Sequence, residues 1–551
     1  MKIALAQIKT IQTDFSQNSK KIIQFAKQAD LEKADIVVFP ELSIPGYLAL
    51  DNFELTSFQK ACTESAKEIA SETSDLNCIL IVGNILISNS RKPYNSALVI
   101  HKGQIIASVK KTLLPEYDIF WEGRYFKSAN TREVVAVDGK RIAVQICEDL
   151  WDENYEIKVT EELIEQKPDL LINISASPFH AGKIRERITL VSNAAKKFNT
   201  AFIYVNMVGA QDGYEGEVIF DGQSFVTDAN GSLVSLAKAF EEDLAIVDLS
   251  STKELVIPNT EKIVEIYHAL VLGIRDYIER NGFKKVYIAL SGGVDSALVC
   301  SLAVKALGSD AVTAVSMPSH ITSEQTLNDA KLLAKNLGIK CELREIASLY
   351  KSWEQGALAA HKELNSITKQ NIQARFRGDI MMEYTNQESG AILLTTGNKT
   401  EVALGYCTLY GDMCGGLSVI GDLSKSVVYE LANFINKDAG TDLIPESIIS
   451  RVPTAELELD QTDEANLPAN YSILSPLVDL FVEEGISLRQ AVDWLEKKGV
   501  KDPEEIARRT KLLIMTSEYK RRQMAPSIRV TRKSFGAGRR FPIIKPRMIN
   551  E

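Results

Sequence analysis

Three side chains near the start of the chain have types that could together hydrolyse an amide. Glu41 follows one apolar run, Cys147 follows another, and Lys111 lies just before a loop that contains Pro115. A thiol can attack an amide carbonyl while a carboxylate shuttles the protons. An ammonium beside them is expected to lower the thiol pKa and to stabilise the tetrahedral oxyanion. Because a lone cysteine on a strand is usually a buried small apolar residue, the prediction rests on all three groups together.

A second segment could bind phosphate. The sequence S-G-G-V-D-S occupies residues 291–296, between an apolar run and a helical pattern. Adjacent glycines allow a tight turn and bring bare N–H groups, with the helix N-terminus behind them, close to an anion. Ser291 and Ser296 can donate hydroxyl hydrogen bonds, and Asp295 can hold Mg²⁺ against phosphates. Neither the G-x-x-x-x-G-K-[ST] nor the G-x-G-x-x-G pattern occurs in the chain.

Composition limits the class of protein that carries these groups. The chain has 551 residues, of which 45% are apolar and 25% charged, as in an ordinary soluble protein of two or three domains. The net charge of −10 argues against a protein that coats nucleic acid. The seven cysteines are scattered without a C-x-x-C pair, so we expect no disulfide framework, no zinc and no haem. Without a signal peptide or a run of roughly 18 apolar residues, the chain is predicted to be cytoplasmic and to bind no membrane.

The three amide-hydrolysing candidates must be positioned by a layered sheet. Up to about residue 250, apolar β-branched runs alternate with helical stretches, and two hairpin signals occur at 99–106 and 226–234. This pattern predicts an α/β or α+β layered domain over residues 1–250. The predicted strands are 3–7, 36–39, 79–82, 97–101, 142–146, 170–174 and 202–205, with helices at 20–28 and 58–72.

The phosphate-binding candidate belongs to a second series of elements. A polar stretch at 251–260 is a predicted linker, and residues 261–551 form the second predicted domain. Alternating strands and helices there predict a doubly wound parallel sheet, in which ligands bind at the carboxyl ends of the strands. The expected elements are a helix at 261–280, then strand 286–290, helix 296–307, strand 312–315, helix 323–337 and strand 340–343.

The glycine-containing segment resembles the pyrophosphate loop of the N-type ATP pyrophosphatases, which have an adenine nucleotide alpha hydrolase fold. These enzymes adenylate an oxygen of the substrate, release diphosphate and let a nucleophile displace AMP. The resemblance implies that the whole loop binds ATP through Ser291, Gly292, Gly293, Val294, Asp295 and Ser296. The loop alone leaves the acceptor substrate open.

Five later segments, in order, resemble NAD synthetase over nearly all of residues 260–525. They are N-I-Q-A-R-F-R at 371–377, L-L-T-T-G-N-K-T-E at 393–401, Y-G-D-M-C-G-G at 410–416, D-L-S-K at 422–425 and P-T-A-E-L at 453–457. The resemblance implies that Thr396, Lys425 and Thr454 contact ATP. It also implies that Glu401 joins Asp295 on Mg²⁺. The residues implied to bind deamido-NAD are Asn371, Arg375, Glu401 and Lys520.

The set of Glu41, Lys111 and Cys147, in its local sequence settings, resembles the nitrilase (carbon–nitrogen hydrolase) superfamily over about residues 1–245. The resemblance implies an αββα sandwich, with the cysteine as nucleophile, the glutamate as general base and the lysine as oxyanion partner. Three further residues match glutamine-binding positions, and a fourth is a candidate second-sphere carboxylate. They are Tyr117, Ser177 and Lys183, and then Glu122.

Together the two resemblances indicate the glutamine-dependent NAD synthetases. They imply that Cys147 forms a γ-glutamyl thioester and releases ammonia, while ATP adenylates the nicotinate carboxylate of deamido-NAD. Ammonia then displaces AMP and leaves NAD, the final step of NAD biosynthesis. The expected partners are L-glutamine, ATP with Mg²⁺, deamido-NAD and, through the second domain, other copies of the chain. Because free ammonia is mostly protonated at neutral pH, an internal passage between the two sites is expected.

Three alternatives stay open at this point. The acceptor could be another substrate, such as a purine nucleotide, or the chain could be a plain amidase with a regulatory nucleotide-binding module. Residues 520–547 hold ten basic residues and no acidic one, so a nucleic-acid-binding arm is the third alternative, although the net charge argues against it. The same segment could also be a solvated tail, or could contact a phosphate-rich ligand or a neighbouring subunit.

Overall fold

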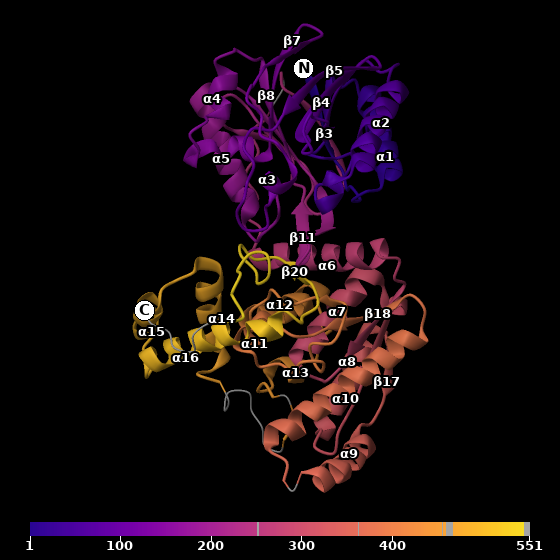
Figure 1. The fold of residues 1–551 in the computed structure, drawn as a ribbon, viewed down its shortest axis with the longest axis vertical. Coiled ribbons are helices and arrows are strands. Elements are labelled where there is room, and N and C mark those ends of the chain that lie inside the picture. Colours follow the sequence, from indigo (N-terminus) through magenta and orange to yellow (C-terminus); the bar gives the residue numbers. More distant parts are fainter. Residues whose placement is uncertain (251–252, 362, 455, 459–466, 545–551) are drawn as a thin grey trace. The chain divides into compact units, whose positions relative to one another are not determined.

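The structure is a computed structural model that describes residues 1–250, 253–361, 363–454, 456–458 and 467–544 (Figure 1). It contains two compact units. Unit 1 comprises Met1–Gly213 and Val218–Thr260, and unit 2 comprises Tyr214–Glu217 and Glu261–Glu551. None of the helices in the described residues is both long and apolar enough to span a bilayer.

Unit 1 contains two six-stranded sheets. The first has the strand order β14 (Asp243–Asp248), β1 (Lys2–Gln7), β2 (Ile36–Val38), β3 (Ile79–Leu86), β4 (Tyr94–His101) and β5 (Gln104–Lys110). The second has the order β13 (Leu233–Leu236), β12 (Phe225–Thr227), β9 (Phe202–Asn206), β8 (Leu170–Ser175), β7 (Lys140–Ile146) and β6 (Val135–Val137). A further pair, β10 (Val208–Asp212) and β11 (Gly216–Asp221), is hydrogen-bonded together.

The two sheets of unit 1 pack face to face, and helices cover their outer faces. Because strand side chains alternate between faces, Ile3 of β1 packs between the sheets with Val144 of β7, whereas Ala4 faces the helices. The first sheet is covered by α1 (Phe15–Leu31) and α2 (Thr56–Glu72), and the second by α4 (Val159–Ile164) and α5 (Lys183–Phe198). The predicted αββα sandwich is confirmed (Figure 1).

The strands and hairpins predicted for unit 1 are all present, but α1 is longer than predicted. It begins at Phe15 rather than near residue 20 because the Asp14 side chain accepts a hydrogen bond of 3.0 Å from the main-chain nitrogen of Gln17. That carboxylate caps the helix N-terminus. The apolar spacing of the sequence does not reveal this first turn.

Six strands of unit 2 form a parallel sheet. Their order is β20 (Ser527–Arg529), β19 (Leu417–Ser418), β18 (Ala391–Thr395), β15 (Lys285–Ala289), β16 (Val312–Ser316) and β17 (Lys340–Leu343). The helices of this unit are α6 (Lys262–Arg280), α7 (Val294–Leu307), α8 (Glu324–Leu337), α9 (Ala347–Ala360), α10 (Ser366–Gln387), α11 (Lys399–Leu404), α12 (Lys425–Ala439), α13 (Glu446–Ser450), α14 (Tyr471–Asp479), α15 (Leu488–Lys497), α16 (Pro503–Thr516) and α17 (Glu518–Arg521).

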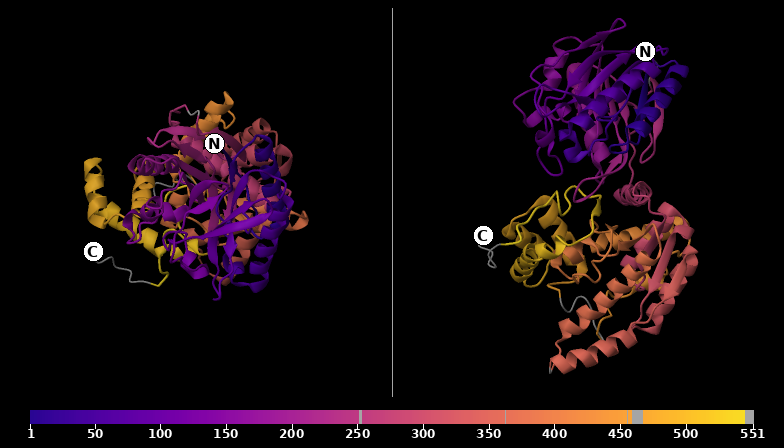
Figure 2. Two further views of the ribbon diagram at one scale, coloured as in Figure 1. Left: turned by 90° about the horizontal axis from the view of Figure 1, so that it is seen from above. Right: turned by 45° about the vertical axis from the view of Figure 1, so that its right-hand side comes forward.

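Helices cover both faces of this sheet. On one face Tyr287 of β15 packs with Ile380 and Met381 of α10. The neighbouring side chains of β15 point the other way, and α7 contacts β15 and β16 while packing against α6 and α12. The predicted doubly wound sheet is confirmed, and Figure 2 shows it from two further directions.

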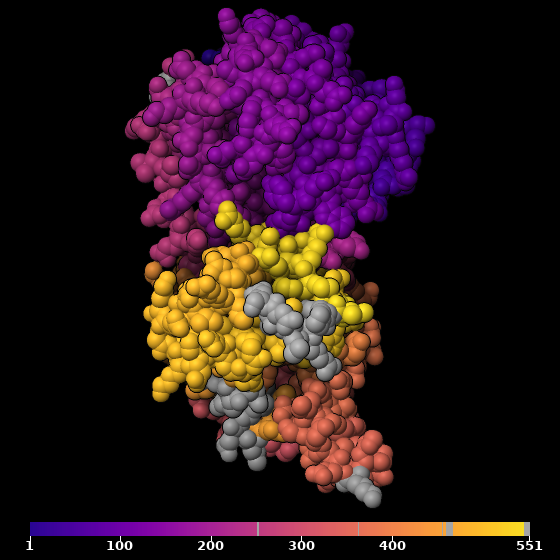
Figure 3. Space-filling view, turned by 60° about the vertical axis from the view of Figure 1, so that its left-hand side comes forward, coloured from indigo at the N-terminus to yellow at the C-terminus, as the bar shows by residue number. Residues whose placement is uncertain are grey.

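The described part of the basic C-terminal segment is folded onto unit 2. The Arg521 guanidinium pairs with Glu518 at 2.9 Å and donates to the carbonyl oxygens of Val402 and Ala403, each at 3.1 Å. Arg539 Nε donates to the carbonyl oxygen of Val482 at 2.7 Å. The interpretation as a solvated tail is therefore wrong for Arg521 and Arg539. Figure 3 shows other atoms of this C-terminal part, in yellow, at the molecular surface. Lys545 and Arg547 lie outside the described residues.

Two candidate active sites

The three amide-hydrolysing candidates converge in unit 1. Cys147 begins a short 3₁₀ helix directly after β7, Glu41 lies just beyond β2, and Lys111 directly follows β5. β2 and β5 run in the same direction within one sheet, so Glu41 and Lys111 lie at the same edge of that sheet. β7, which leads into Cys147, belongs to the second sheet of the sandwich. All three side chains are buried.

Lys111 is paired with two carboxylates. Its Nζ lies 2.8 Å from Glu41 Oε1 and 2.7 Å from Glu122 Oε1. Burial alone would lower the pKa of Lys111, but the two carboxylates raise it well above its usual value. The ammonium therefore stays charged. Tyr47 and Asn95 complete the network, because the Tyr47 hydroxyl donates to Glu122 at 2.6 Å and the Asn95 amide donates to Glu41 at 2.7 Å.

The Cys147 thiol is not the low-pKa group that the sequence predicted. Burial and the Glu41 carboxylate raise its pKa well above the ordinary value, and Lys111 opposes them only in part. The physical reason is that the lysine charge is already balanced by two carboxylates. The thiol is therefore protonated at rest, and a base must remove the proton as the sulfur attacks. Burial likewise raises the pKa of Glu122 to about 7.

Two features that sequence reasoning missed hold these groups in place. Asp149 accepts hydrogen bonds from the main-chain nitrogens of Thr112 (3.0 Å), Leu113 (2.8 Å) and Ile146 (3.2 Å). One carboxylate thus joins the loop after Lys111 to the strand end before the nucleophile. Gly83 of β3 is the second feature, because a Cβ atom there would lie 2.2 Å from the carbonyl oxygen of Pro40. The sequence around each residue contains no signal of these contacts.

The predicted glutamine-binding residues lie around the turn that carries the nucleophile. The Tyr117 hydroxyl donates to Glu148 at 3.0 Å, and Tyr155 donates to the same carboxylate at 2.9 Å. Lys183 Nζ lies 4.2 Å from the centre of the Trp151 ring. Glu148 and Trp151 closely follow Cys147 in the chain, so Tyr117 and Lys183 contact residues of the same turn. Ser177 lies in the turn after β8.

The phosphate-binding candidate opens onto a cavity of about 310 Å³ in unit 2. Gly292 has a φ of +83°, and a Cβ atom there would lie 2.5 Å from the carbonyl oxygen of Thr326, so only glycine fits without strain. Ser296 Oγ accepts a hydrogen bond of 3.3 Å from the Ser291 nitrogen. The predicted ATP and metal residues that line the cavity are Ser291, Gly293, Val294, Asp295, Ser296, Thr396, Glu401, Lys425 and Thr454.

A buried lysine joins the two acidic side chains of this cavity. Lys425 Nζ contacts Asp295 and lies 3.2 Å from Glu401 Oε1. Burial would lower the pKa of Lys425, but the two carboxylates raise it. Asn398 donates to Asp295 at 2.9 Å and also caps α11. The described residues contain no group of three or more potential metal ligands, yet two carboxylates suit Mg²⁺ when substrate phosphates and water supply its other oxygen ligands.

Three of the residues predicted to bind deamido-NAD do not line this cavity. Asn371 accepts a hydrogen bond of 2.9 Å from the Thr408 hydroxyl, and Arg375 donates to the carbonyl oxygen of Leu409 at 3.2 Å. Lys520 donates to the carbonyl oxygens of Gly405 and Cys407, each at 2.7 Å. The structure thus gathers the three side chains around the loop at 405–409, which reaches the cavity through Cys407.

Two arginines that line the cavity were missed as site residues. Arg451 donates to the Thr326 hydroxyl at 2.9 Å and contacts Asp329. Burial lowers the pKa of Arg377 to about 10. A signal for Arg377 was present in the segment at 371–377, whereas Arg451 comes beside the cavity only through the fold.

Comparison with known proteins decides the family. Residues 2–255 match the family described as "Carbon-nitrogen hydrolase", and residues 266–524 match "NAD synthase". A "Glutamine-dependent NAD(+) synthetase" of Synechocystis is 37% identical over 564 residues, covering 98% of each chain. The chain belongs to the glutamine-dependent NAD(+) synthetase family. A relative of the same description from Thermotoga maritima is 36% identical, again over 98% of each chain.

Solved structures agree with this membership. The glutamine-dependent NAD+ synthetase of Acinetobacter baumannii, determined with ADP, superposes with a TM-score of 0.76 at 34% identity, over 100% of this chain and 99% of that one. The enzyme of Cytophaga hutchinsonii shares the fold with a TM-score of 0.84 at 22% identity, over 99% and 98% of the two chains. The family, the fold and the class of enzyme predicted from the motifs are therefore confirmed.

Proposed function

We propose that the chain converts deamido-NAD to NAD at the expense of ATP, with ammonia taken from L-glutamine, and releases AMP, diphosphate and L-glutamate. The observation that carries the proposal is the presence, in one chain, of a buried Glu41–Lys111–Cys147 cluster and a cavity bordered by a phosphate-binding loop. We assign glutamine hydrolysis to residues 1–250 and NAD synthesis to residues 261–551, joined by a linker at 251–260.

The amidase reaction begins with proton transfer from the Cys147 thiol to Glu41. The sulfur attacks the side-chain amide carbon of glutamine, and Lys111 stabilises the negative charge on the amide oxygen. Glu41 then gives the proton to the leaving nitrogen, so that ammonia departs and a γ-glutamyl thioester stays on the sulfur. Water, deprotonated by Glu41, attacks the thioester carbon, glutamate is released, and Glu41 returns the proton to the departing Cys147 sulfur. The raised pKa of the Cys147 thiol supports this mechanism, because a protonated thiol needs a base to remove its proton as the sulfur attacks.

Glutamine recognition is assigned to groups around the nucleophile turn. Free glutamine carries an α-ammonium and an α-carboxylate, and Glu148 and Lys183 have the complementary charges. Both contact aromatic side chains of this region, Glu148 through Tyr117 and Lys183 through Trp151. We place Tyr117, Ser177 and Lys183 in direct contact with glutamine.

In the second site the glycine-containing loop and Lys425 bind the ATP phosphates, together with Thr396 and Thr454. The nicotinate carboxylate of deamido-NAD attacks the α-phosphorus and diphosphate leaves. Ammonia attacks the adenylated carboxyl carbon, loses a proton and expels AMP. Asp295 and Glu401 would hold Mg²⁺, which supplies charge neutralisation on the phosphates when it is bound. Asn371, Arg375, Glu401 and Lys520 are assigned to deamido-NAD; three of them meet at the loop 405–409.

We also propose that unit 2 associates with further copies of the chain. In α9 the only buried side chain is Tyr350, while Leu349 and Leu358 are each 45% exposed. Ile367 at the start of α10 is 69% exposed. Apolar side chains of this kind on adjoining helices are typical of a surface covered in an assembly. In Figures 1 and 2 α9 lies at the periphery of unit 2.

The direct test is a product assay with the purified protein. With Mg²⁺, ATP, glutamine and deamido-NAD, equal amounts of NAD, AMP and diphosphate are expected. Replacing deamido-NAD with xanthosine monophosphate or aspartate tests the other acceptors. Glutamine hydrolysis that needs no ATP, with no AMP formed under any of these conditions, would favour the plain amidase and overturn the proposal.

A further inference from the structure

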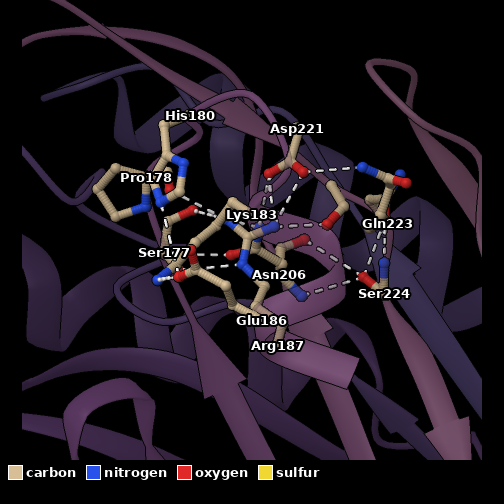
Figure 4. Close-up of polar contacts among 12 residues, drawn as sticks. Ser177, Pro178, His180, Lys183, Glu186, Arg187, Asn206, Asp221, Gln223 and Ser224 are labelled. Atoms are coloured by element: carbon tan, nitrogen blue, oxygen red, sulfur yellow. Dashed lines mark hydrogen bonds and ion pairs between the residues drawn. The ribbon is translucent and has the colours of Figure 1, made fainter. Parts of the chain in front are cut away.

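Arg187 of α5 is fully buried, and its charge is balanced by one carboxylate (Figure 4). Its Nη1 lies 2.7 and 2.9 Å from the two carboxylate oxygens of Asp221, which is also fully buried. Gln223 donates to the same carboxylate at 2.9 Å. Because removing two charges from water costs about as much as their attraction returns, a gain in stability does not account for this buried pair.

The other donors of Arg187 hold the turn that follows β8. Nη2 donates to the carbonyl oxygens of Ser177 at 2.8 Å and Pro178 at 3.1 Å, and Nε donates to the Ser177 hydroxyl at 3.2 Å. The Ser177 nitrogen donates to Asn206 of β9 at 2.9 Å. The nitrogen, carbonyl and hydroxyl groups of Ser177 are therefore all held, the last two by one guanidinium.

The same turn touches the general base. The Ala176 nitrogen donates to Glu41 Oε2 at 2.9 Å, whereas Oε1 accepts from Lys111 at 2.8 Å and from Asn95 at 2.7 Å. Among the described residues, Oε2 receives only the bond from Ala176, so this oxygen has the freer lone pair. A proton from the Cys147 thiol would go to Oε2, and Ala176 sets the direction in which that oxygen points.

We propose that Arg187 is a positioning residue of the amidase site. It fixes the 176–178 turn, so that the Ala176 N–H orients the proton-accepting oxygen of Glu41 and Ser177 stays in place for glutamine. Asp221 binds Nη1, and so keeps the guanidinium charged and fixes its orientation toward the turn. The inference rests on the proposed amidase function, and it assigns Arg187 no contact with substrate.

The test is the variant Arg187→Lys, which keeps a positive charge opposite Asp221 but lacks the planar fork of donors. Glutamate release is measured against glutamine concentration, and ammonia-supported NAD synthesis reports on unit 2 of the same molecules. We expect kcat for glutamine hydrolysis to fall on the order of 100-fold, as for a catalytic group displaced by about 1 Å, and KM for glutamine to rise. Ammonia-supported synthesis should be unchanged.

A merely structural role predicts a different result. Partial unfolding would lower the apparent kcat in proportion to the folded fraction, seen by near-UV circular dichroism, and would leave KM unchanged. Gln223→Met is the matched control, because it removes a hydrogen bond from the far side of Asp221 and leaves the Arg187 contacts with the turn. Its kcat and KM should equal those of the wild type.

Two outcomes would overturn the inference. One is a folded Arg187→Lys protein with wild-type kcat and KM. If that variant does not fold, Asn206→Ala decides, because it frees the Ser177 nitrogen without removing either member of the ion pair; unchanged kinetics there would equally refute the role of the turn. A wild-type protein that releases no glutamate would refute the proposed function instead, so the two failures are distinguishable.

Discussion

Replacing Gly83 with alanine is expected to disable the amidase site without changing any catalytic side chain. Gly83 lies in β3 against the turn that carries Glu41. A Cβ atom at this position would lie 2.2 Å from the carbonyl oxygen of Pro40 and 2.3 Å from the main-chain nitrogen of Leu42. Both are backbone atoms, so rotation of a side chain cannot relieve the clash.

The size of the effect follows from these distances. Ordinary contact begins at 3.4 Å, so the turn must retreat by about 1 Å. A catalytic group misplaced by about 1 Å costs on the order of 100-fold in rate, and an extra methyl group in a packed core costs about 1–3 kcal/mol of stability. We therefore expect Gly83→Ala to lower glutamine-supported NAD synthesis on the order of 100-fold while the protein stays folded.

The assay compares NAD formation with glutamine and with ammonium chloride as nitrogen source. Only the first uses Glu41, so ammonia-supported synthesis should stay near the wild-type rate. Gly139→Ala is the control, because nothing lies within 4 Å of its added Cβ atom; Gly139, unlike Gly83, has a positive φ, of +72°. It introduces backbone strain of about 1–2 kcal/mol without moving the turn. Wild-type glutamine-supported activity in Gly83→Ala would refute the idea that this contact positions Glu41.

Four further predictions concern the two sites and the assembly. Cys147→Ala should abolish glutamine-supported synthesis and keep ammonia-supported synthesis, whereas Asp295→Ala should lose both; glutamine-supported turnover in Cys147→Ala would contradict its role as nucleophile. Because burial and Glu41 raise the pKa of the Cys147 thiol, its alkylation by iodoacetamide, followed by mass spectrometry, should still accelerate above about pH 9; a plateau near neutral pH would show a low-pKa thiol. Burial raises the pKa of Glu122 to about 7, above an unfolded value of about 4.3, so the folded state binds more protons and this group's contribution to the free energy of unfolding declines as pH rises from about 4 to 7. Urea titrations of Glu122→Gln should show a flatter dependence over that range, and an unchanged curve would argue against the shift. Leu349→Lys combined with Leu358→Lys should reduce the mass measured by light scattering, while an unchanged mass would place any interface elsewhere.

Much of the fold was readable from the periodicity of the sequence. The run at 170–174, apolar except for Asn173, predicted β8 correctly because a strand buried on both faces is predominantly apolar. The alternation of strands and helices from residue 286 onward predicted the parallel sheet because adjacent parallel strands need a crossover connection, which is usually a helix. The start of α1 was not predicted, since it depends on a single cap made by Asp14. Local patterns identify elements well and their ends less well.

The chemical types at the two sites were also readable, because each reactive residue directly follows an apolar strand or opens a helix. The residues that hold these reactive groups in position were not readable from the sequence. Gly83, Asp149 and Arg187 act on Glu41 and Cys147 through contacts between segments distant in the chain. The sequence on either side of each of these three residues does not indicate that it makes such a contact.

The amino-acid sequence was sufficient to predict which reactive groups form the two sites, because their identities and their places after strands are local properties. The tertiary arrangement was needed to learn that the pKa of the nucleophile is raised and that Arg521 and Arg539 of the basic segment pack onto unit 2. The pKa of Cys147 depends on burial and on how far Lys111 is already neutralised by Glu41 and Glu122. Desolvation and Coulomb interactions are set by distances in space, and chain order does not specify those distances.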